Sequence, residues 1–377
     1  MPFDFGSLRR HPDVEGPGLE ASDAADRLIL DEAAVLIREA GPGEVVVVDD
    51  SYGALALAAA DAGARGIRVH QDLVTGERAL AENAARIELS DTVDARPLGP
   101  ELFGGARLVL LRLPRSLDRL DEVAGLIAAH ARPEVVIVGG GRIKHMSLAM
   151  NDVLRRRFGR VDVSHARQKS RVLIAREPGG PATTAASPAD WPRSARHDDL
   201  GLEVVAHGGV FAGTGVDIGT RFLLEQLGDA VPDAATAVDL ACGSGIVAAR
   251  LARERPGLRV TATDRSAAAA ASARLTAAAN GVADRVHVTR ADGLEGLVDA
   301  SEPLIVLNPP FHSDAAISTG IAAHLFADAA RVLGPGGELW CVWNSHLRYR
   351  PLLERVVGPT RQIARNAKFT VTASRAR

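Results

Sequence analysis

The sequence predicts an α/β protein with two similar domains in tandem, each a mostly parallel sheet covered by helices on both faces. The chain has 377 residues, about two and a half times a typical domain of roughly 150 residues. In its second half, short β-branched runs alternate with longer segments rich in Ala, Leu and Arg, a pattern typical of βαβ units. Segments of the first half match segments of the second half in the same order, which indicates a duplication.

The elements of the second half follow from this alternation. Its β-branched runs predict strands at 236–240, 258–263, 285–289, 303–307, 337–343 and 368–373. The segments between them predict helices at 245–255, 266–279 and 318–333. A shorter helical segment around 350–357 separates the last two strands, so we expect these strands to form an antiparallel pair at the sheet edge.

Five matches between the halves support the duplication. They pair Val48–Gly53 with Val238–Gly243, Arg68–Asp72 with Val260–Asp264, Leu108–Pro114 with Leu304–Pro310, Arg132–Val138 with Gly334–Val342, and Ala166–Arg171 with Ala364–Phe369. The stretch EPGGPATTAASPADWPRSAR lies between the halves, is dense in Pro, Gly, Ser, Thr and Ala, and has no hydrophobic period. The predicted domains are therefore 1–176 and 201–377, joined by a linker at 177–200.

Composition narrows the class of protein. The 46% of hydrophobic and 24% of charged residues are close to the globular average and exclude a wholly disordered chain. The opening residues have no apolar core of the kind found in export signals, and no uninterrupted apolar run approaches ~18 residues, so we expect a cytoplasmic protein without a membrane span. Cys242 and Cys341 are too few for a disulfide framework, and no His, Cys and carboxylate grouping has metal-ligand spacing, so no metal is expected.

The net charge of −3 conceals two basic stretches. Residues 142–176 carry 10 basic and 2 acidic side chains, and residues 346–377 carry 8 and 1. The remaining two stretches, 1–141 and 177–345, are acidic, at −10 and −8. The basic side chains near the end of the first half predict a surface for an RNA backbone. Its members are Arg155, Arg156, Arg157, Arg160, Arg167, Lys169 and Arg171.

The strongest local motif is Asp239-Leu240-Ala241-Cys242-Gly243-Ser244-Gly245, where an acidic residue ends a buried strand and a Gly-x-Gly turn leads into a helix. Glycines let the backbone turn sharply and let a ligand lie against it, and the helix start offers free N–H groups. Asp264 ends the next strand, where a carboxylate can accept both hydroxyls of a ribose. Asp292 follows the third strand and could meet an adenine amino group.

The fourth strand ends in Asn308-Pro309-Pro310-Phe311-His312. Two prolines remove backbone donors and stiffen the segment, which leaves the Asn308 amide oxygen and the Pro309 carbonyl to accept hydrogen bonds from an exocyclic amine. Phe311 then offers a flat face to a planar substrate. Two acceptors would orient the lone pair of the amine toward an electrophile, so the pattern predicts alkylation of an amine without a strong base.

These motifs resemble those of the class I S-adenosylmethionine-dependent methyltransferases, and in particular the ribosomal RNA guanine-N2-methyltransferases of the RsmC/RlmG type. Gly209-Val210-Phe211, Asp217-Ile218-Gly219-Thr220-Arg221, His312, Asn344-Ser345-His346-Leu347 and Lys368-Phe369 add to the resemblance. It covers most of residues 204–377 strongly and the first half weakly. It implies two tandem Rossmann-like class I methyltransferase domains, of which the second is catalytic.

The resemblance also implies a cofactor, a substrate and a set of site residues. The cofactor is S-adenosylmethionine, and the partner is ribosomal RNA or a ribosomal subunit, with a monomeric protein as the expected state. Catalytic positions are Asn308, Pro309, Pro310 and Phe311. Cofactor contacts are expected at Asp239, Ala241, Gly243, Gly245, Asp264, Arg265, Ala291, Asp292, Phe211 and Thr220, and substrate contacts at His312, Lys368 and Phe369.

The first domain departs from the pattern. Aligned by the matches above, the Gly-x-Gly becomes Gly53-Ala54-Leu55, and Asn-Pro-Pro becomes Arg112-Leu113-Pro114. Leu55 in place of the second glycine should obstruct the cofactor, and an arginine is a donor only and cannot guide an amine. We therefore expect a degenerate domain that keeps the fold without the activity. Two alternatives stay open: a methyltransferase acting on a protein glutamine amide or a DNA adenine, and a non-catalytic RNA-binding factor of ribosome assembly.

Overall fold

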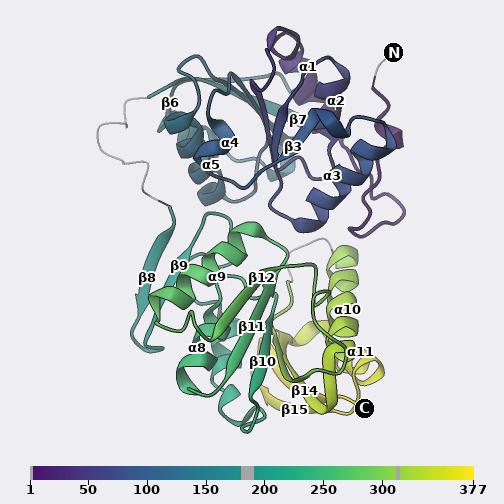
Figure 1. Ribbon diagram of the computed structural model, residues 1–377, viewed down its shortest axis with the longest axis vertical. Coiled ribbons are helices and arrows are strands. Elements are labelled where there is room, and N and C mark those ends of the chain that lie inside the picture. Colours follow the sequence, from purple (N-terminus) through teal and green to yellow (C-terminus); the bar gives the residue numbers. More distant parts are fainter. Residues whose placement is uncertain (1–2, 180–190, 311–314) are drawn as a thin grey trace. The chain divides into compact units, whose positions relative to one another are not determined.

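The computed structural model describes residues 3–179, 191–310 and 315–377, and the chain forms two compact units, Met1–Trp191 and Pro192–Arg377 (Figure 1). Each unit contains a seven-stranded sheet in which most strands are parallel. The predicted α/β class is confirmed. Within the described residues, no helix is long and apolar enough to cross a membrane.

The first unit alternates strands and helices as the duplication predicts (Figure 1, purple to teal). Its first strand consists of four consecutive valines, all fully buried, because helices cover both faces of a parallel sheet. The elements are α1 (Ala24–Glu39), β1 (Val45–Val48), α2 (Ala54–Asp61), β2 (Ile67–His70), α3 (Val74–Arg86), β3 (Val93–Ala95), α4 (Pro100–Phe103), β4 (Leu108–Arg112), α5 (Leu117–His130), β5 (Val136–Arg142), α6 (Ala149–Arg155), β6 (Phe158–Val163) and β7 (Ser170–Pro178).

The second unit repeats this plan after a short two-stranded sheet (Figure 1, teal to yellow). The predicted helices and strands are all present, with ends that differ by a few residues. The elements are β8 (Arg193–His197), β9 (Leu202–Ala206), α7 (Ile218–Leu224), β10 (Thr236–Leu240), α8 (Ile246–Glu254), β11 (Arg259–Asp264), α9 (Ala267–Ala279), β12 (Val286–Arg290), β13 (Glu302–Leu307), α10 (Ala315–Val332), β14 (Leu333–Asn344), α11 (Arg350–Val356), β15 (Thr360–Arg365) and β16 (Phe369–Arg375).

The two large sheets have the same topology. Their strand orders are β3-β2-β1-β4-β5-β7-β6 and β12-β11-β10-β13-β14-β16-β15. The expected antiparallel pair is β14 with β16, and β15 is a further antiparallel edge strand that the sequence did not predict. The chain order reverses between β10 and β13, and open α/β sheets bind ligands at the carboxyl ends of the strands at such a reversal.

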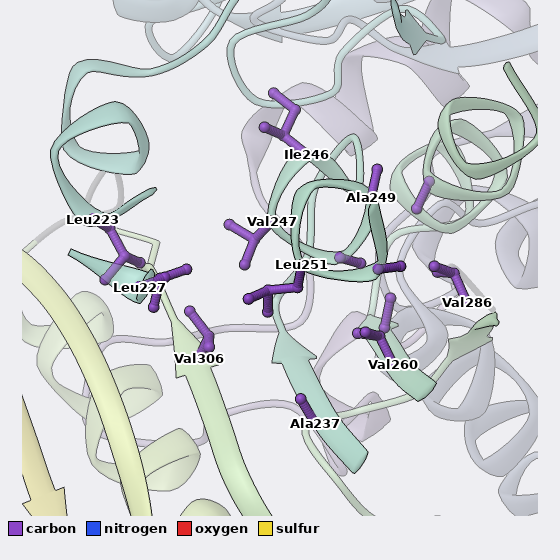
Figure 2. Packing of buried hydrophobic residues seen from close by; sticks show 14 of the residues in the cluster. Leu223, Leu227, Ala237, Ile246, Val247, Ala249, Leu251, Val260, Val286 and Val306 are labelled. Atoms are coloured by element: carbon purple, nitrogen blue, oxygen red, sulfur yellow. The ribbon is translucent and has the colours of Figure 1, made fainter. Parts of the chain in front are cut away.

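A dry core holds these strand ends in place. Val247 and Leu251 of α8 pack beside Val260 of β11 and Val306 of β13, and each is at most 6% exposed (Figure 2). Truncating a leucine as buried as Leu251 to alanine would cost roughly 2–5 kcal/mol. The carboxyl-end loops therefore rest on a rigid base.

Helix α9 anchors the segment that leads into the second unit. The Thr276 hydroxyl accepts from the Val205 N–H at 3.0 Å and donates to the Val205 carbonyl at 3.1 Å. One turn further on, the Asn280 side chain accepts from the Glu203 N–H at 3.0 Å and donates to the Glu203 carbonyl at 2.6 Å. These side chains satisfy one edge of β9 as a neighbouring strand would. They fix the start of the segment that reaches the carboxyl end of the sheet.

Candidate functional site

The turn from β10 to α8 is built around a buried carboxyl group. Asp239 is 3% exposed, and its Oδ2 accepts a hydrogen bond from the Ala248 N–H at 2.9 Å. Burial raises the pKa of Asp239 to about 7, although the hydrogen bond from Ala248 opposes the shift. The turn is therefore built on a carboxyl group that is buried and held by the backbone of α8.

Gly243 and Gly245 have different structural roles in this turn. Both have positive φ, 54° at Gly243 and 77° at Gly245. A Cβ on Gly245 would lie 2.8 Å from the Cα and Cβ of Ala273, so this glycine allows α8 and α9 to approach closely. A Cβ on Gly243 would meet nothing within 4 Å. The protein therefore leaves space beside the Gly243 backbone, where a ligand can lie.

Asp264 is bound to this turn. Its Oδ2 accepts from the Gly243 N–H at 3.0 Å, and its Oδ1 accepts from the Ser266 N–H at 2.9 Å. The structure thus places Asp264 beside Gly243, in a position to accept hydroxyl groups of a ribose. Ala241 belongs to the same turn, and Arg265 follows Asp264 in the loop to α9.

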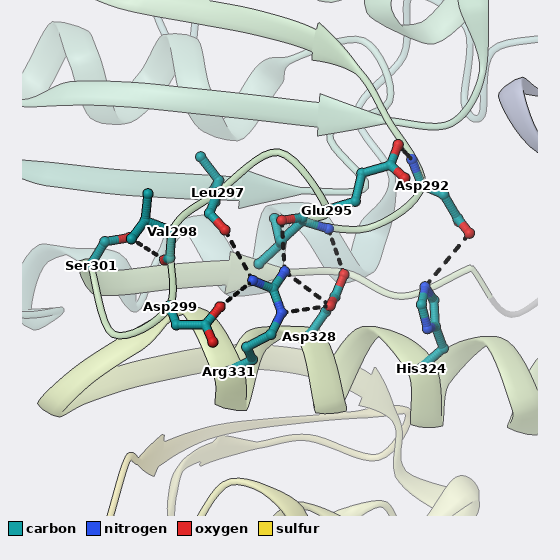
Figure 3. Close-up of polar contacts among 10 residues, drawn as sticks. Asp292, Glu295, Leu297, Val298, Asp299, Ser301, His324, Asp328 and Arg331 are labelled. Atoms are coloured by element: carbon teal, nitrogen blue, oxygen red, sulfur yellow. Dashed lines mark hydrogen bonds and ion pairs between the residues drawn. The ribbon is translucent and has the colours of Figure 1, made fainter.

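The loop after β12 brings a third carboxylate to this end of the sheet. Ala291 is buried, and its N–H donates to the Asp264 carbonyl at 3.0 Å. The next residue, Asp292, lies 3.7 Å from Nε2 of His324 on α10 (Figure 3). Sequence reasoning did not find His324, because its partner lies 32 positions away and no local pattern connects them.

A second set of contacts from α10 holds the rest of this loop (Figure 3). Arg331 donates to the carbonyls of Leu294 and Leu297 at 2.8 and 2.9 Å. Asp328 accepts from the Leu294 N–H at 2.6 Å. Backbone groups of the loop are thereby satisfied from the helix, which fixes the position from which Asp292 projects.

Asn308, at the end of β13, has a defined side-chain orientation. Its Nδ2 donates to Thr220 Oγ1 at 2.9 Å and to Asp217 Oδ2 at 3.3 Å. A carboxylate can only accept, so the side of the amide that faces Asp217 must be the NH₂ group. Asp217 is itself fixed, because it caps α7 and accepts from the Thr220 N–H at 3.1 Å.

Because Nδ2 of Asn308 is bound by Thr220 and Asp217, the amide oxygen Oδ1 is the atom that remains to meet a substrate. Within the described residues, Oδ1 of Asn308 accepts no hydrogen bond, and the side chain is partly exposed. Pro309 is buried and Pro310 exposed. Phe311 and His312 lie outside the residues that the structure describes. Asn308 therefore presents an acceptor at the carboxyl end of β13, as the prediction requires.

The remaining predicted residues lie in different environments. Phe211 is 49% exposed, whereas Phe369 is 5% exposed and packs against Gly219 at the start of α7. The Lys368 Nζ lies 5.3 Å from the centre of the Phe369 ring, and this lysine is exposed. Thr220, predicted as a cofactor contact, places its hydroxyl on Asn308. Within the described residues, no group of three His, Cys, Asp or Glu side chains could hold a metal ion.

The first unit contains the same turn, and the structure corrects the alignment of the two halves. Helix α2 begins after Gly53 as α8 begins after Gly245, and both glycines have positive φ, 95° and 77°. Four residues earlier, Asp49 and Ala241 both have a φ of 57°. The predicted match of Gly53 with Gly243 is therefore wrong by two positions. It relied on an Asp-x-x-x-Gly pattern that occurs in both halves at different points of the turn.

With this correction, the residues at the positions of Asp239, Asp264 and Asn308 all differ in the first unit. The strand registers place Val47 where Asp239 stands. The Ser51 N–H donates to Oε1 of Gln71 at 3.1 Å, the counterpart of the bond from Gly243 to Asp264. A neutral amide thus replaces the carboxylate suited to ribose hydroxyls.

Arg112 ends β4 at the place of Asn308, as the sequence predicted. Its guanidinium donates to Asp23 and Asp26, both at 2.8 Å. Asp23 caps α1, and Asp26 lies three residues further on, as Thr220 follows Asp217. An internal ion-pair cluster therefore occupies the position at which the second unit presents an acceptor.

The comparisons with known proteins agree with this geometry. Residues 1–179 match the RLMG N-terminal domain, and residues 201–373 match the Methyltransferase small domain. A "Ribosomal RNA large subunit methyltransferase G" of Streptomyces coelicolor is 36% identical over 383 residues, covering 98% of each chain. The protein of the same name from Pseudomonas entomophila is 34% identical and covers 99% of this chain and 98% of its own.

The chain belongs to the ribosomal RNA large subunit methyltransferase G family. A solved structure with the same fold is the T. thermophilus 16S rRNA N2 methyltransferase RsmC in complex with AdoMet and guanosine, with a TM-score of 0.73, 24% sequence identity and 97% coverage of both chains. The predicted two-domain class I methyltransferase fold is confirmed.

Proposed function

We propose that the second unit transfers a methyl group from S-adenosylmethionine to the 2-amino group of a guanine in large-subunit ribosomal RNA. Family membership supports the reaction and the ribosomal RNA, since the relatives carry that activity in their names. The observation that carries the choice of an amine is the orientation of Asn308, whose oxygen is left to accept. The preference for guanine N2 follows from the resemblance of the motifs.

The turn after β10 fits the cofactor. Space lies beside the Gly243 backbone, and the Gly243 N–H holds the Asp264 carboxylate there, where it can meet the ribose hydroxyls. Asp292 projects from the neighbouring loop, where it can accept from an adenine amino group. S-adenosylmethionine bound there supplies a methyl group on a sulfonium centre, which is already activated for transfer.

The protein then has to orient the amine. Asn308 Oδ1 and the Pro309 carbonyl accept its two N–H groups, which directs the nitrogen lone pair out of the base plane. One N–H proton leaves to water after the methyl group is attached, so no residue has to act as a strong base. A glutamine amide or an adenine amine would satisfy the same two acceptors, and the family membership favours ribosomal RNA over them.

We also propose a division of labour between the units. The first unit does not bind S-adenosylmethionine, because Gln71 replaces a carboxylate and Arg112 is enclosed by Asp23 and Asp26. It contributes to RNA recognition, and the protein acts as a monomer in the cytoplasm, where ribosomal RNA is available. Size-exclusion chromatography with light scattering tests the monomer.

The test of the function combines a variant with a product analysis. In cells without the gene, mass spectrometry of ribosomal RNA should show one 2-methylguanine fewer, and the wild-type gene should restore it. Asn308→Ala should not restore it, although the purified variant should bind S-adenosylmethionine with an unchanged Kd by calorimetry. Wild-type methylation by Asn308→Ala would refute the role of the amide. Loss of a methyladenine in place of the methylguanine would favour the alternative substrate.

A further inference from the structure

Ion pairs engage more than half of the basic side chains at 142–176. Six arginines of this stretch contact acidic side chains, and these six arginines share four carboxylates. The pairs are Arg155 with Asp152, Arg156 and Arg157 with Asp121, Arg160 and Arg176 with Asp162, and Arg167 with Asp31. The Arg155–Arg157 triplet is therefore not a free cationic surface, contrary to the expectation from sequence.

Four cations of the same stretch have no ion pair within the described residues: Arg142, Lys144, Lys169 and Arg171. They lie together at one end of the first sheet, where Arg142 ends β5 and is in register with Ser170 at the start of β7. Both lysines are exposed, and both arginines are half-buried. We call these four residues the β5–β7 rim.

The rim corresponds to a part of the second unit that lies beside the proposed site. The Ile143 N–H donates to the Lys169 carbonyl at 2.9 Å, and the Ser345 N–H donates to the Lys368 carbonyl at 2.8 Å. Lys169 is therefore the structural counterpart of Lys368, which the sequence predicted as a substrate contact. Both lysines lie at the carboxyl-end rim of their own sheet, where α/β sheets bind ligands.

We propose that the β5–β7 rim binds the phosphate backbone of the RNA substrate. In the first unit Gln71 stands where the second unit has Asp264, and Arg112 is engaged by Asp23 and Asp26. The rim beside them holds a concentration of cations without acidic partners in the described part of the chain, and lysine and arginine are the side chains that pair with phosphate. This proposal rests on the proposed action on ribosomal RNA.

A pair of matched double variants tests it. Lys144→Ala with Lys169→Ala removes two charges from the rim. Arg155→Ala with Arg160→Ala removes two charges from the same stretch, but from arginines that are already paired with Asp152 and Asp162. Both variants change the net charge equally, so any difference between them comes from position. All four side chains are exposed, and the urea unfolding transition of the first unit, followed by circular dichroism, reports whether that unit is folded in each variant.

The measurement is the affinity for protein-free ribosomal RNA from cells without the gene, over roughly 50–300 mM KCl. Each phosphate contact contributes about 0.7–0.9 to the slope of log K against log salt, so the rim variant should lose about 1.5 of that slope. The control variant should keep the wild-type slope. Equal slopes for the two variants would refute RNA binding by the β5–β7 rim and would leave the proposed methylation unaffected. A wild-type protein that neither binds nor methylates this RNA would refute the proposed function itself.

Discussion

Thr220→Val should reduce the rate of methyl transfer without weakening cofactor binding. The Thr220 hydroxyl accepts from Asn308 Nδ2 at 2.9 Å and is one of two contacts that fix the amide. Valine has nearly the same shape and cannot accept, so the substitution removes that bond alone. The backbone N–H of residue 220 still donates to Asp217, which keeps the cap of α7.

The expected loss is moderate. A neutral hydrogen bond contributes about 1 kcal/mol net, which corresponds to a roughly fivefold lower kcat if the oriented amide is needed in the transition state. A complete loss is not expected, because Asp217 still accepts from Asn308 at 3.3 Å. If the amide turned over, its oxygen would face the Asp217 carboxylate and the two would repel each other.

Thr220→Ser serves as the control, since it keeps the hydroxyl, and it should retain a kcat close to that of the wild type. Methyl incorporation into ribosomal RNA gives kcat, and calorimetry gives the Kd for S-adenosylmethionine. A raised Kd with an unchanged kcat would show that Thr220 contacts the cofactor, as the sequence predicted. An unchanged kcat and Kd for the valine variant would refute the orienting role.

Three further predictions concern stability. The pKa of Asp239 and of Asp50 is raised from 3.8 to about 7 by burial, so the folded protein holds protons that the unfolded chain releases, and stability falls as pH rises from about 4 to 7. Urea unfolding of Asp239→Asn and of Asp50→Asn should each show a weaker pH dependence, and only the former should lose activity. Gly245→Ala should lower Tm strongly, because the new Cβ would lie 2.8 Å from Ala273. Gly243→Ala has open space around the new Cβ, so it should lower the free energy of unfolding by only about 1 kcal/mol, the cost of a positive φ for alanine. Arg112→Ala should destabilise the first unit by about 3–5 kcal/mol, since it leaves the buried Asp26 and the partly exposed Asp23 without their partner, and an unchanged unfolding midpoint would contradict this.

The sequence predicted the features that depend on local pattern. Alternating β-branched and Ala-rich segments identified the parallel sheets, because strands buried on both faces need continuous apolar runs. The motif from Asp239 to Gly245 and the Asn308 strand end were recognisable because a turn and a proline pair restrict the backbone in ways that few residues permit.

Features that depend on distant partners were not predictable. The contact of Asn308 with Asp217 joins residues 91 positions apart, and its only local signal was the Asp-x-x-Thr cap of α7. The ion pairs of Arg156 and Arg157 with Asp121 likewise join two segments, 142–176 and 1–141, whose charges were counted separately in the sequence. For the same reason a stretch with a charge of +8 contains few free cations within the described residues. The match of Gly53 with Gly243 was wrong by two positions because it relied on similar residue types. The equivalent positions are set by where the strand ends and the helix begins, which pairs Gly53 with Gly245.

In the two units, the same arrangement of a capped helix and a strand end binds two different side chains, Arg112 in the first and Asn308 in the second. In both, an aspartate caps the helix before the first strand, and the residue three positions later joins it in binding the end of the fourth strand. With Thr220 as the second partner, one carboxylate faces a neutral amide, and the amide keeps an oxygen for a substrate. With Asp26 as the second partner, two carboxylates require a cation, and Arg112 has no acceptor to offer. A change from amide to guanidinium at this strand end therefore stabilises the first unit by ion pairing and removes its capacity to orient an amine.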